Sequence, residues 1–312
     1  MKKISILLAV VLIGGTVFFF SSKFRRKPPS SPFHPSRLVI KGSDTEVQLV
    51  SNVAELFSKG NPGADIRVTG GGSGVGIASL LNGEIDIANS SRAISDKEIE
   101  QAKSKQMNIR EFRLARDGIA VIVHPENPIQ QLTLEQVGKI YKGDVANWNM
   151  VGGTNGAISL YGRQTTSGTF VFFRDFVVKA EYASSMRNME GNQAIVDAVK
   201  EDQKGIGYVG IGYIKDAQGQ SRKDIKVIPI VVVAGQQPVS PLNKEAVQKG
   251  EYPISRTIFQ YIASTPKSGS LLEKFLRFEV STEGQTAVEQ SGFYSLAQSD
   301  SAKNQLFFET IK

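Results

Sequence analysis

Stretches rich in branched apolar residues and polar turns follow one another along the chain in a regular order. Residues 38–40 and 66–68 are two such stretches that predict strands, and each is followed by a turn rich in Gly, Ser, Thr or Asp. After the first turn, apolar residues recur at helical spacing between residues 47 and 57. Because strands that alternate with helices are typical of parallel sheets, this pattern predicts an α/β fold.

The same order continues through the rest of the chain. Residues 85–88 and 118–123 predict further strands, and the second is expected to be buried because it is continuously apolar. Residues 205–210 match G-x-G-x-x-G, but the string neither follows a strand nor opens a helix, so it does not indicate a dinucleotide site. The remaining predicted strands are at 157–161 and 227–233, with two further strands joined by a turn at 205–214. Helices are predicted through 77–81 and at 95–105, 134–141, 170–178, 191–200, 271–280 and from 283 onward.

Several of the polar turns carry the chemistry of an anion site. They are found at residues 42–45, 70–74, 89–92 and 163–169. The last combines backbone N–H groups at a helix start, hydroxyl groups and the guanidinium of Arg163, which are donors suited to an oxyanion. A helix cap beside an unrelated arginine explains any single turn of this kind at least as well. Ligands of parallel α/β sheets bind where the carboxyl ends of the strands gather, so the repetition favours one shared anion pocket.

The chain begins with an export signal. Lys2 and Lys3 precede an uncharged apolar run at residues 4–22. The run has no Ala-x-Ala-like cleavage site and, at 19 residues, is long enough to span a bilayer, which favours an uncleaved signal anchor over a cleaved peptide. The basic residues at 23–27 argue against export, since positive flanks tend to stay in the cytoplasm. Residues 28–35, rich in Pro and Ser, predict a stiff spacer.

The basic excess of the chain belongs to this N-terminal segment. The formal net charge is +7, from 37 Lys and Arg against 30 Asp and Glu. Residues 1–36 hold six of the basic residues and no acidic one, so 31 basic residues face 30 acidic ones in the rest of the chain. A nucleic-acid-binding domain would carry the excess on its own surface, so no nucleic-acid partner is predicted.

Missing residue types and motifs exclude several further classes of protein. The chain has no Cys, which excludes disulfides, thiol catalysis, thiolate metal sites and a lipid-anchoring cysteine. Its two histidines, His34 and His124, are too few for a histidine-built zinc site, and no metal or cofactor is predicted. The motifs G-x-S-x-G and H-E-x-x-H and the P-loop lysine string are absent. A secreted hydrolase that uses Ser167 or Ser73 with His124 is the enzymatic alternative, but the sequence predicts no enzyme.

Six short motifs occur in the order found in one protein family. They are GSDT at 42–45, GGSG at 71–74, DIANSSR at 86–92, R-x-x-x-SGT at 163–169, IGY at 206–208 and YPISR at 252–256. With these motifs the chain, over residues 37–300, resembles the phosphate-binding proteins of phosphate ABC importers. The R-x-x-x-SGT motif in this company is the specific part of the resemblance, since a glycine-rich turn alone is common.

The resemblance implies a two-lobed, type II periplasmic-binding-protein fold. Each lobe would be a mostly parallel sheet flanked by helices, and crossover strands at or next to residues 118–123 and 257–262 would join the lobes. The implied divisions are residues 1–36 as signal and spacer, residues 37–117 with 258–312 as lobe 1, and residues 118–257 as lobe 2.

The resemblance also implies which residues bind phosphate. They are Ser43, Asp44, Thr45, Ser73, Ser91, Arg92, Arg163, Ser167, Gly168 and Thr169. Such donors suit phosphate, because a small and highly charged anion is buried only if its oxygens are met by hydrogen bonds. Many family members have Asp where this chain has Ser91, and that carboxylate accepts the proton of hydrogen phosphate and so rejects sulfate. Here Asp44 is either a substitute acceptor or an ordinary turn residue.

The expected protein is an exported receptor on the periplasmic or extracellular face of the cytoplasmic membrane, anchored by residues 4–22. It would capture inorganic phosphate between two lobes and deliver it to the transmembrane subunits of an ABC permease. Export is preferred despite the basic flank, because the resemblance is to exported proteins. Two alternatives stay open: a receptor for sulfate, molybdate or tungstate, and a membrane-tethered phosphate sensor or adhesion module that feeds no permease.

Overall fold

The computed structural model describes residues 37–216, 219–233 and 235–311. The predicted export signal, anchor and spacer of residues 1–36 therefore lie outside the described residues. Across the described ranges, every helix falls short of the length or the hydropathy that a bilayer span requires.

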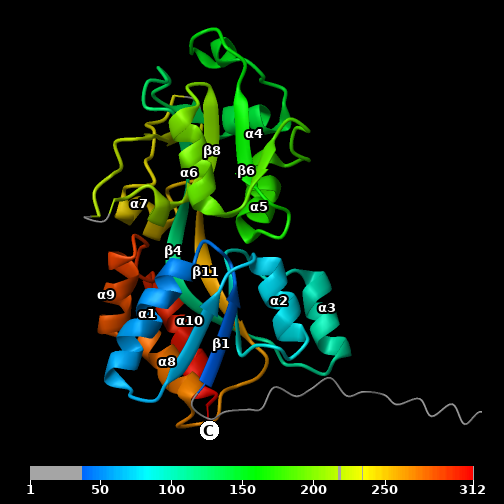
Figure 1. Cartoon of the computed structure of the whole chain (residues 1–312), viewed down its shortest axis with the longest axis vertical. Coiled ribbons are helices and arrows are strands. Elements are labelled where there is room, and N and C mark those ends of the chain that lie inside the picture. Colours follow the sequence, from blue (N-terminus) through cyan, green and yellow to red (C-terminus); the bar gives the residue numbers. More distant parts are fainter. Residues whose placement is uncertain (1–36, 217–218, 234, 312) are drawn as a thin grey trace, which may run out of the picture. The chain divides into compact units, whose positions relative to one another are not determined.

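The first part of the described chain folds in the predicted order of strand, turn and helix (Figure 1). Strand β1 (Arg37–Gly42) pairs in parallel with β2 (Asp65–Thr69) on one side and with β3 (Ile87–Ser90) on the other. Helix α1 (Val47–Gly60) lies on one face of these strands and α2 (Ser73–Leu81) on the opposite face (Figure 1). Since the strands are parallel, their carboxyl ends and the turns that follow them share one edge of the sheet.

A second parallel group of strands is built from later residues. Strand β6 (Ser159–Arg163) pairs in parallel with β7 (Arg187–Met189) and with β8 (Gly205–Gly210). Helix α5 (Gly168–Phe173) follows the turn after β6, and α6 (Gly191–Glu201) packs against β8 and β6. The turn between β6 and α5 therefore lies at the carboxyl edge of this second group.

Strand β4 (Arg110–Val123) takes part in both groups. Its first part pairs antiparallel with β11 (Ser255–Ile262), which also pairs with β3, and its second part pairs antiparallel with β8. The order of strands is therefore β2-β1-β3-β11-β4-β8-β6-β7. Strands β4 and β11 include residues 118–123 and 257–262, the positions at which the resemblance implied crossovers. Only the continuously apolar end of β4 was predicted from sequence. Its first part alternates charged and apolar residues, which fits a half-buried strand whose Phe112 and Leu114 are buried.

Several predicted element boundaries are wrong. The strand expected at 227–233 is divided into β9 (Lys226–Ile228) and β10 (Ile230–Val231), because Pro229 between them has no N–H group for a ladder. The chain at 205–214 is one strand, β8, followed by a 3₁₀ turn at Ile211–Tyr213 rather than by a second strand. The helix expected at 170–178 is α5 followed by a π-helical turn at Arg174–Val178.

The other described elements complete the layers around the sheet. They are α3 (Asp96–Ser104), β5 (Leu132–Thr133), α4 (Leu134–Lys142), a 3₁₀ turn at Trp148–Val151, α7 (Lys244–Lys249), α8 (Leu271–Glu279), α9 (Thr282–Gln290) and α10 (Gln298–Glu309). Buried apolar side chains form one cluster around β8 and the second part of β4, which includes Val121, Tyr141 and Tyr208. Another cluster includes Leu49 of α1, Phe112 of β4 and Phe275 of α8.

Candidate functional site

Three serines from three separate turns meet in the structure. The Ser43 and Ser91 hydroxyl oxygens are 2.8 Å apart, and the Ser91 and Ser73 hydroxyl oxygens are 3.4 Å apart. The Ser73 hydroxyl also accepts a hydrogen bond of 3.1 Å from the backbone N–H of Ser91. All three residues are buried: Ser43 directly follows β1, Ser73 is the first residue of α2, and Ser91 directly follows β3. The parallel pairing of β2, β1 and β3 therefore gathers three of the predicted anion-binding turns at one point.

The fourth turn, between β6 and α5, contacts this serine cluster through a glycine. An ideal Cβ atom placed on Gly168 would lie 2.2 Å from the Ser73 hydroxyl oxygen and 3.0 Å from that of Ser91. Such distances exclude any side chain, so the Gly168 backbone approaches the serines directly. Ser167, just before it, caps α5 by accepting a 3.3 Å hydrogen bond from the Phe170 N–H. The sequence motif Ser-Gly-Thr thus has a steric reason for its glycine.

Further hydrogen bonds link the fourth turn to the first two. The hydroxyl oxygens of Thr45 and Thr169 are 3.0 Å apart, and both residues are buried. The Gly74 N–H donates to the Thr166 carbonyl oxygen at 3.1 Å. Residues more than a hundred positions apart in the sequence therefore form a single buried polar cluster.

Arg163 supplies the buried positive charge of the cluster. The residue is 0% exposed, and its Nη2 donates to Asp44 Oδ2 at 2.5 Å. Its Nε donates to the Gln164 side-chain oxygen at 3.2 Å, whereas Nη1 has no hydrogen-bond partner among the described residues. Burial lowers the pKa of Arg163, and the Asp44 carboxylate opposes this shift. A buried guanidinium with one unsatisfied N–H donor group is suited to bind an additional acceptor.

Hydrogen bonds of Asp44 connect the turn after β1 to the turn before α2, to the turn after β6 and to Tyr213. Its Oδ1 accepts a 2.7 Å hydrogen bond from the Gly71 N–H, and its Oδ2 accepts from Arg163 and, at 3.5 Å, from Gln164. Its backbone carbonyl accepts from the Tyr213 hydroxyl at 3.0 Å. Both interpretations of Asp44 made from sequence remain compatible with this geometry, since it orders the turn and also presents a carboxylate beside Arg163.

The guanidinium of Arg92 is not brought to the cluster. Its Nη1 and Nη2 donate to the two carboxylate oxygens of Glu98 at 2.8 and 2.7 Å, and Nη1 also donates to the Ala93 carbonyl oxygen. Glu98 in turn forms a capping box with Ser95 at the start of α3. The sequence placed Arg92 beside Ser91, but the nearby helix start provides the carboxylate that holds its side chain.

Two site-adjacent residues were missed as members of the site. Arg256 of β11 donates from Nη1 to the Ser91 carbonyl oxygen at 2.9 Å, and its Nε and Nη2 donate to Asp117 Oδ2 at 2.9 and 2.6 Å. Asp117 of β4 also accepts from the Ile211 N–H at 3.0 Å. One sequence signal could have identified both residues. Each is a charged residue next to a buried apolar run, and burying a charge is costly unless the charge is paired.

Tyr208 and Asn192 support the cluster from the second group of strands. The Tyr208 hydroxyl accepts a 3.2 Å hydrogen bond from the Arg163 N–H, and burial raises the pKa of Tyr208 to about 12. Asn192 Nδ2 donates to the Thr45 hydroxyl oxygen at 3.5 Å, and its Oδ1 accepts from the Gly210 N–H at 3.4 Å. Sequence pattern gave no reason to select either residue, because Asn192 lies in an ordinary helix start and Tyr208 in a buried strand.

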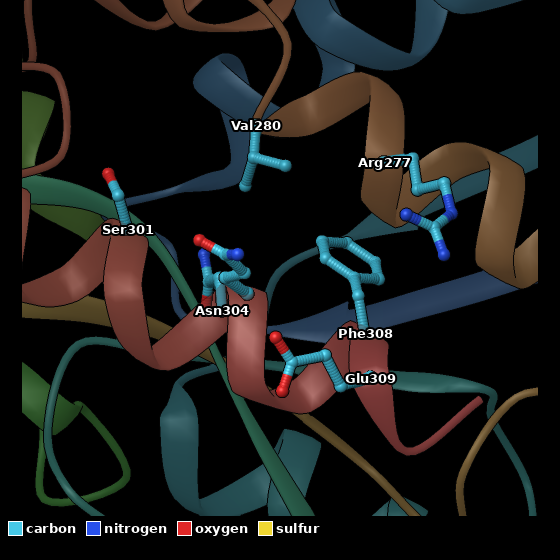
Figure 2. Close-up of a pocket in the computed structure, with 7 residues that line it drawn as sticks. Arg277, Val280, Ser301, Asn304, Phe308 and Glu309 are labelled. Carbon is cyan, nitrogen blue, oxygen red and sulfur yellow. The ribbon is translucent and has the colours of Figure 1, made fainter.

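A surface groove of about 400 Å³ between α8 and α10 offers a different set of groups (Figure 2). Figure 2 shows the Phe308 ring turned toward Arg277, and the centre of the guanidinium lies 4.4 Å from the centre of the ring. Arg277 Nε also donates to Glu273 at 2.8 Å. Because this arginine is already paired and the neighbouring walls include Glu309, the groove lacks the converging donors found in the serine cluster.

The chain is similar to several known proteins. The family described as "PBP superfamily domain" matches residues 29–283. The chain is 28% identical over 257 residues to the phosphate-binding protein PstS of Staphylococcus haemolyticus (strain JCSC1435), covering 81% of this chain and 79% of that relative. A Clostridium perfringens structure with bound phosphate, described as a phosphate ABC transporter substrate-binding protein, has a TM-score of 0.71 and 26% identity and covers 83% of this chain and 99% of its own. An ABC-type phosphate transport receptor of Vibrio cholerae has a TM-score of 0.65 and 25% identity, with 82% and 99% covered.

Proposed function

This chain belongs to the PBP superfamily domain family, and we propose that it captures inorganic phosphate outside the cytoplasm and delivers it to an ABC permease. The relatives named above are phosphate-binding proteins of ABC phosphate transport, and one of the similar structures contains phosphate. The observation that carries the proposal is the approach of Gly168 to the hydroxyls of Ser73 and Ser91, beside a buried arginine with an unpaired N–H donor group.

We propose a phosphate-binding set drawn from all four turns. It consists of Ser43, Asp44, Thr45, Ser73, Ser91, Arg163, Ser167, Gly168 and Thr169. Arg92 is left out, because its guanidinium would have to give up two hydrogen bonds to Glu98. Each hydrogen bond to a charged group contributes about 1.5–3 kcal/mol, so a handful supports micromolar binding, about 8 kcal/mol, after the costs of ordering.

The hydroxyls of the cluster bond to one another in the present arrangement. Phosphate oxygens would replace these partners, and the turn at residues 163–169 would move away from the serines to admit the anion. The hydrogen bonds Thr45–Thr169 and Gly74–Thr166 would then open and re-form around the ligand. This is selection of a closed state by a ligand that touches both sides.

We propose that the moving parts are the two lobes expected from sequence, residues 37–117 with 258–312 and residues 118–257. Two observations support this division. The apolar cluster around β8 draws its buried residues from positions 119–254 and from Tyr294, and the cluster that contains Leu49 and Phe275 draws none from positions 118–257. Strands β4 and β11 are the connections that would bend.

Export, anchoring by residues 4–22 and the permease partner complete the proposal. They are supported by the apolar run that follows Lys2 and Lys3 and by the family of the relatives. A receptor for sulfate, molybdate or tungstate is the second candidate, because the family resemblance implies a carboxylate that accepts the phosphate proton at the position where this chain has Ser91. Binding without catalysis is proposed. His124 accepts a 3.2 Å hydrogen bond from the Glu126 N–H in its own turn, outside the serine cluster.

Titration of the purified full-length chain in detergent with phosphate, sulfate, molybdate and tungstate tests this function. We expect phosphate to bind with a Kd of about 1 μM or lower and at least about tenfold more tightly than the other anions. Heat signals for another oxyanion alone would shift the assignment to that ligand. The absence of binding for all four would refute the proposed function.

A further inference from the structure

Glu46 is a buried acid directly behind the proposed phosphate site. It lies at the start of α1, is 0% exposed, and its backbone N–H donates to the Ser43 carbonyl oxygen at 3.1 Å. Neither carboxyl oxygen has a hydrogen-bond partner among the described residues, and the nearby Ser43 hydroxyl lowers the pKa of the carboxyl. A buried carboxyl without a defined partner is unusual and calls for a specific explanation.

The groups that face Glu46 do not neutralise a negative charge on it. Arg256 of β11 is the cation that most lowers the pKa of Glu46, and its donors are already directed at Asp117 and at the Ser91 carbonyl. The other charged neighbours are acids, Asp117 of β4 and Glu279 of α8. Burial therefore raises the pKa of Glu46 well above its usual value, with Arg256 and the Ser43 hydroxyl opposing the shift and the two acids adding to it.

The proton of Glu46 affects how Ser43 can use its own proton. A hydroxyl donates one hydrogen bond, and the Ser43 hydroxyl lies 2.8 Å from that of Ser91 within the serine cluster. When Glu46 is protonated it can donate to Ser43, which leaves the Ser43 proton free to point toward an anion. When Glu46 is ionised it attracts the Ser43 proton to itself and adds a negative charge behind the anion.

We propose that Glu46 is a positioning and specificity-determining residue that, in its protonated form, keeps Ser43 a hydrogen-bond donor to a doubly charged oxyanion. This inference rests on the proposed phosphate-binding function and names the charge state that the site accepts. Ionisation of Glu46 removes one donor from the site and repels the ligand. Phosphate binding and retention of the Glu46 proton are therefore linked, so binding at alkaline pH is accompanied by proton uptake.

The test compares the affinity for inorganic phosphate of the full-length chain and of Glu46→Gln between about pH 6 and about pH 9. Glutamine keeps the size and the donor group but cannot ionise. Because the titration of phosphate itself is the same for both proteins, it cancels in the ratio of their affinities. We expect the affinity of the wild type relative to Glu46→Gln to fall by at least about tenfold across this range.

The matched control is Glu279→Gln, which removes a second buried acid whose carboxyl is bonded to Gln260 instead of lying against a serine of the site. Its affinity is expected to follow the wild-type pH profile within about threefold. If the pH dependence of phosphate affinity disappeared in Glu279→Gln and remained in Glu46→Gln, Glu279 would be the linked acid. That result would overturn the proposal.

A second measurement does not depend on any variant folding. Calorimetry of the wild type at about pH 9, where inorganic phosphate is already doubly charged, in two buffers of different ionisation enthalpy, gives the number of protons taken up on binding. Net proton uptake is expected. Phosphate binding without uptake, or affinities of wild type and Glu46→Gln that stay parallel, would overturn this inference alone, whereas failure of the wild type to bind phosphate at any pH would overturn the proposed function as well.

Discussion

Arg163 and Arg92 both follow a strand in a polar turn, yet their guanidinium groups have different partners. Arg92 spends two donor groups on the carboxylate of Glu98. Arg163 is buried, shares Asp44 with Gln164, and keeps Nη1 without a partner among the described residues. The cost of burying an unsatisfied charged donor is recovered only when an acceptor arrives, so Arg163 is the arginine expected to recognise the anion.

Replacement of Arg163 by alanine is expected to weaken phosphate binding by at least about tenfold without unfolding the protein. The loss follows from removing the buried positive charge and its free donor. Calorimetric titration, with thermal unfolding as a check of the fold, measures both effects. Arg92→Ala is the control and is expected to change the Kd by less than about threefold. Wild-type affinity in Arg163→Ala would rule out the assigned role.

At the scale of single residues, the sequence predicted the positions of the serine hydroxyls better than the partners of the charged side chains. The turns that hold Ser43, Ser73 and Ser91 were identified because each follows a strand or begins a helix, which is a local property of the chain, and the family resemblance then named the serines themselves. The roles of Arg92 and Arg256 depend on Glu98 and Asp117, and the partner of Arg256 lies more than a hundred residues away in the sequence. The pairing of Arg256 over such a distance has no local signal, so Arg256 was not selected. Glu98 lies only six residues after Arg92, and its pairing with Arg92 holds that guanidinium away from the serine cluster.

The backbone of the turn before α5, at residues 163–169, reaches the serine cluster directly. Gly168 has no room for a Cβ atom, whose ideal position lies 2.2 Å from the Ser73 hydroxyl oxygen. Any side chain there would push the turn at 163–169 away from the turns after β1 and β3. The geometry of the whole turn therefore depends on Gly168 having no Cβ atom.

Gly168→Ala is expected to reduce phosphate affinity by at least about tenfold, because the methyl group would separate the donors of the two sides. Gly60→Ala is a suitable control, since a Cβ atom there meets nothing within 4 Å. Titration of both variants with phosphate measures the difference. Equal affinities in Gly168→Ala and Gly60→Ala would show that phosphate binding does not require the close approach of this turn.

Strands β4 and β11 carry a buried ion pair at the point where they run beside the site. Asp117 accepts two hydrogen bonds from Arg256, and both side chains are almost completely buried. Asp117→Asn leaves the guanidinium buried without its counter-charge and is expected to cost about 3–5 kcal/mol of unfolding free energy, or roughly 10 °C in Tm. Thermal unfolding measures this change.

Asp65→Asn provides the comparison, because Asp65 forms its ion pairs with Arg37 and Arg67 near the surface. Its expected cost is below about 1 kcal/mol. An Asp117→Asn variant that is as stable as Asp65→Asn would show that the buried pair does not hold β4 and β11 together.

Among the elements, several helices were predicted with correct positions, as α1, α4 and α6 show, and so was the buried end of β4. Mixed strands were not. The first part of β4 alternates charged and apolar residues, and its length depends on β11, a strand more than a hundred residues later in the chain. The division between β9 and β10 follows from Pro229, whose effect on a ladder was readable but was not applied.

The molecule as a whole is expected to lose stability as the pH rises, because buried acids prefer their protonated form. Burial raises the pKa of Glu279 well above its usual value, and its hydrogen bond from Gln260 opposes this only in part. In the unfolded chain a glutamate titrates near about pH 4.3. The folded state therefore keeps its proton to higher pH, so the stability from this group is intact below the unfolded pKa and is lost as the pH rises through the folded pKa.

Glu279→Gln is expected to flatten the fall of Tm between about pH 5 and about pH 9, since the variant has no proton to lose at this position. Thermal unfolding followed by circular dichroism at several pH values measures the slope. Glu135→Gln is the control, because Glu135 lies at the surface with Lys139. An unchanged slope in Glu279→Gln would mean that this carboxyl titrates as it does in the unfolded chain.

The central claim is that donors from four turns, widely separated in sequence, enclose one tetrahedral anion. A crystal structure of the full-length chain grown with phosphate tests it most directly. The account predicts phosphate oxygens within about 3 Å of Arg163 Nη1, of the Ser43, Ser73 and Ser91 hydroxyls and of the Gly168 N–H. Phosphate bound elsewhere, or a serine cluster that stays closed on itself at saturating phosphate, would contradict it.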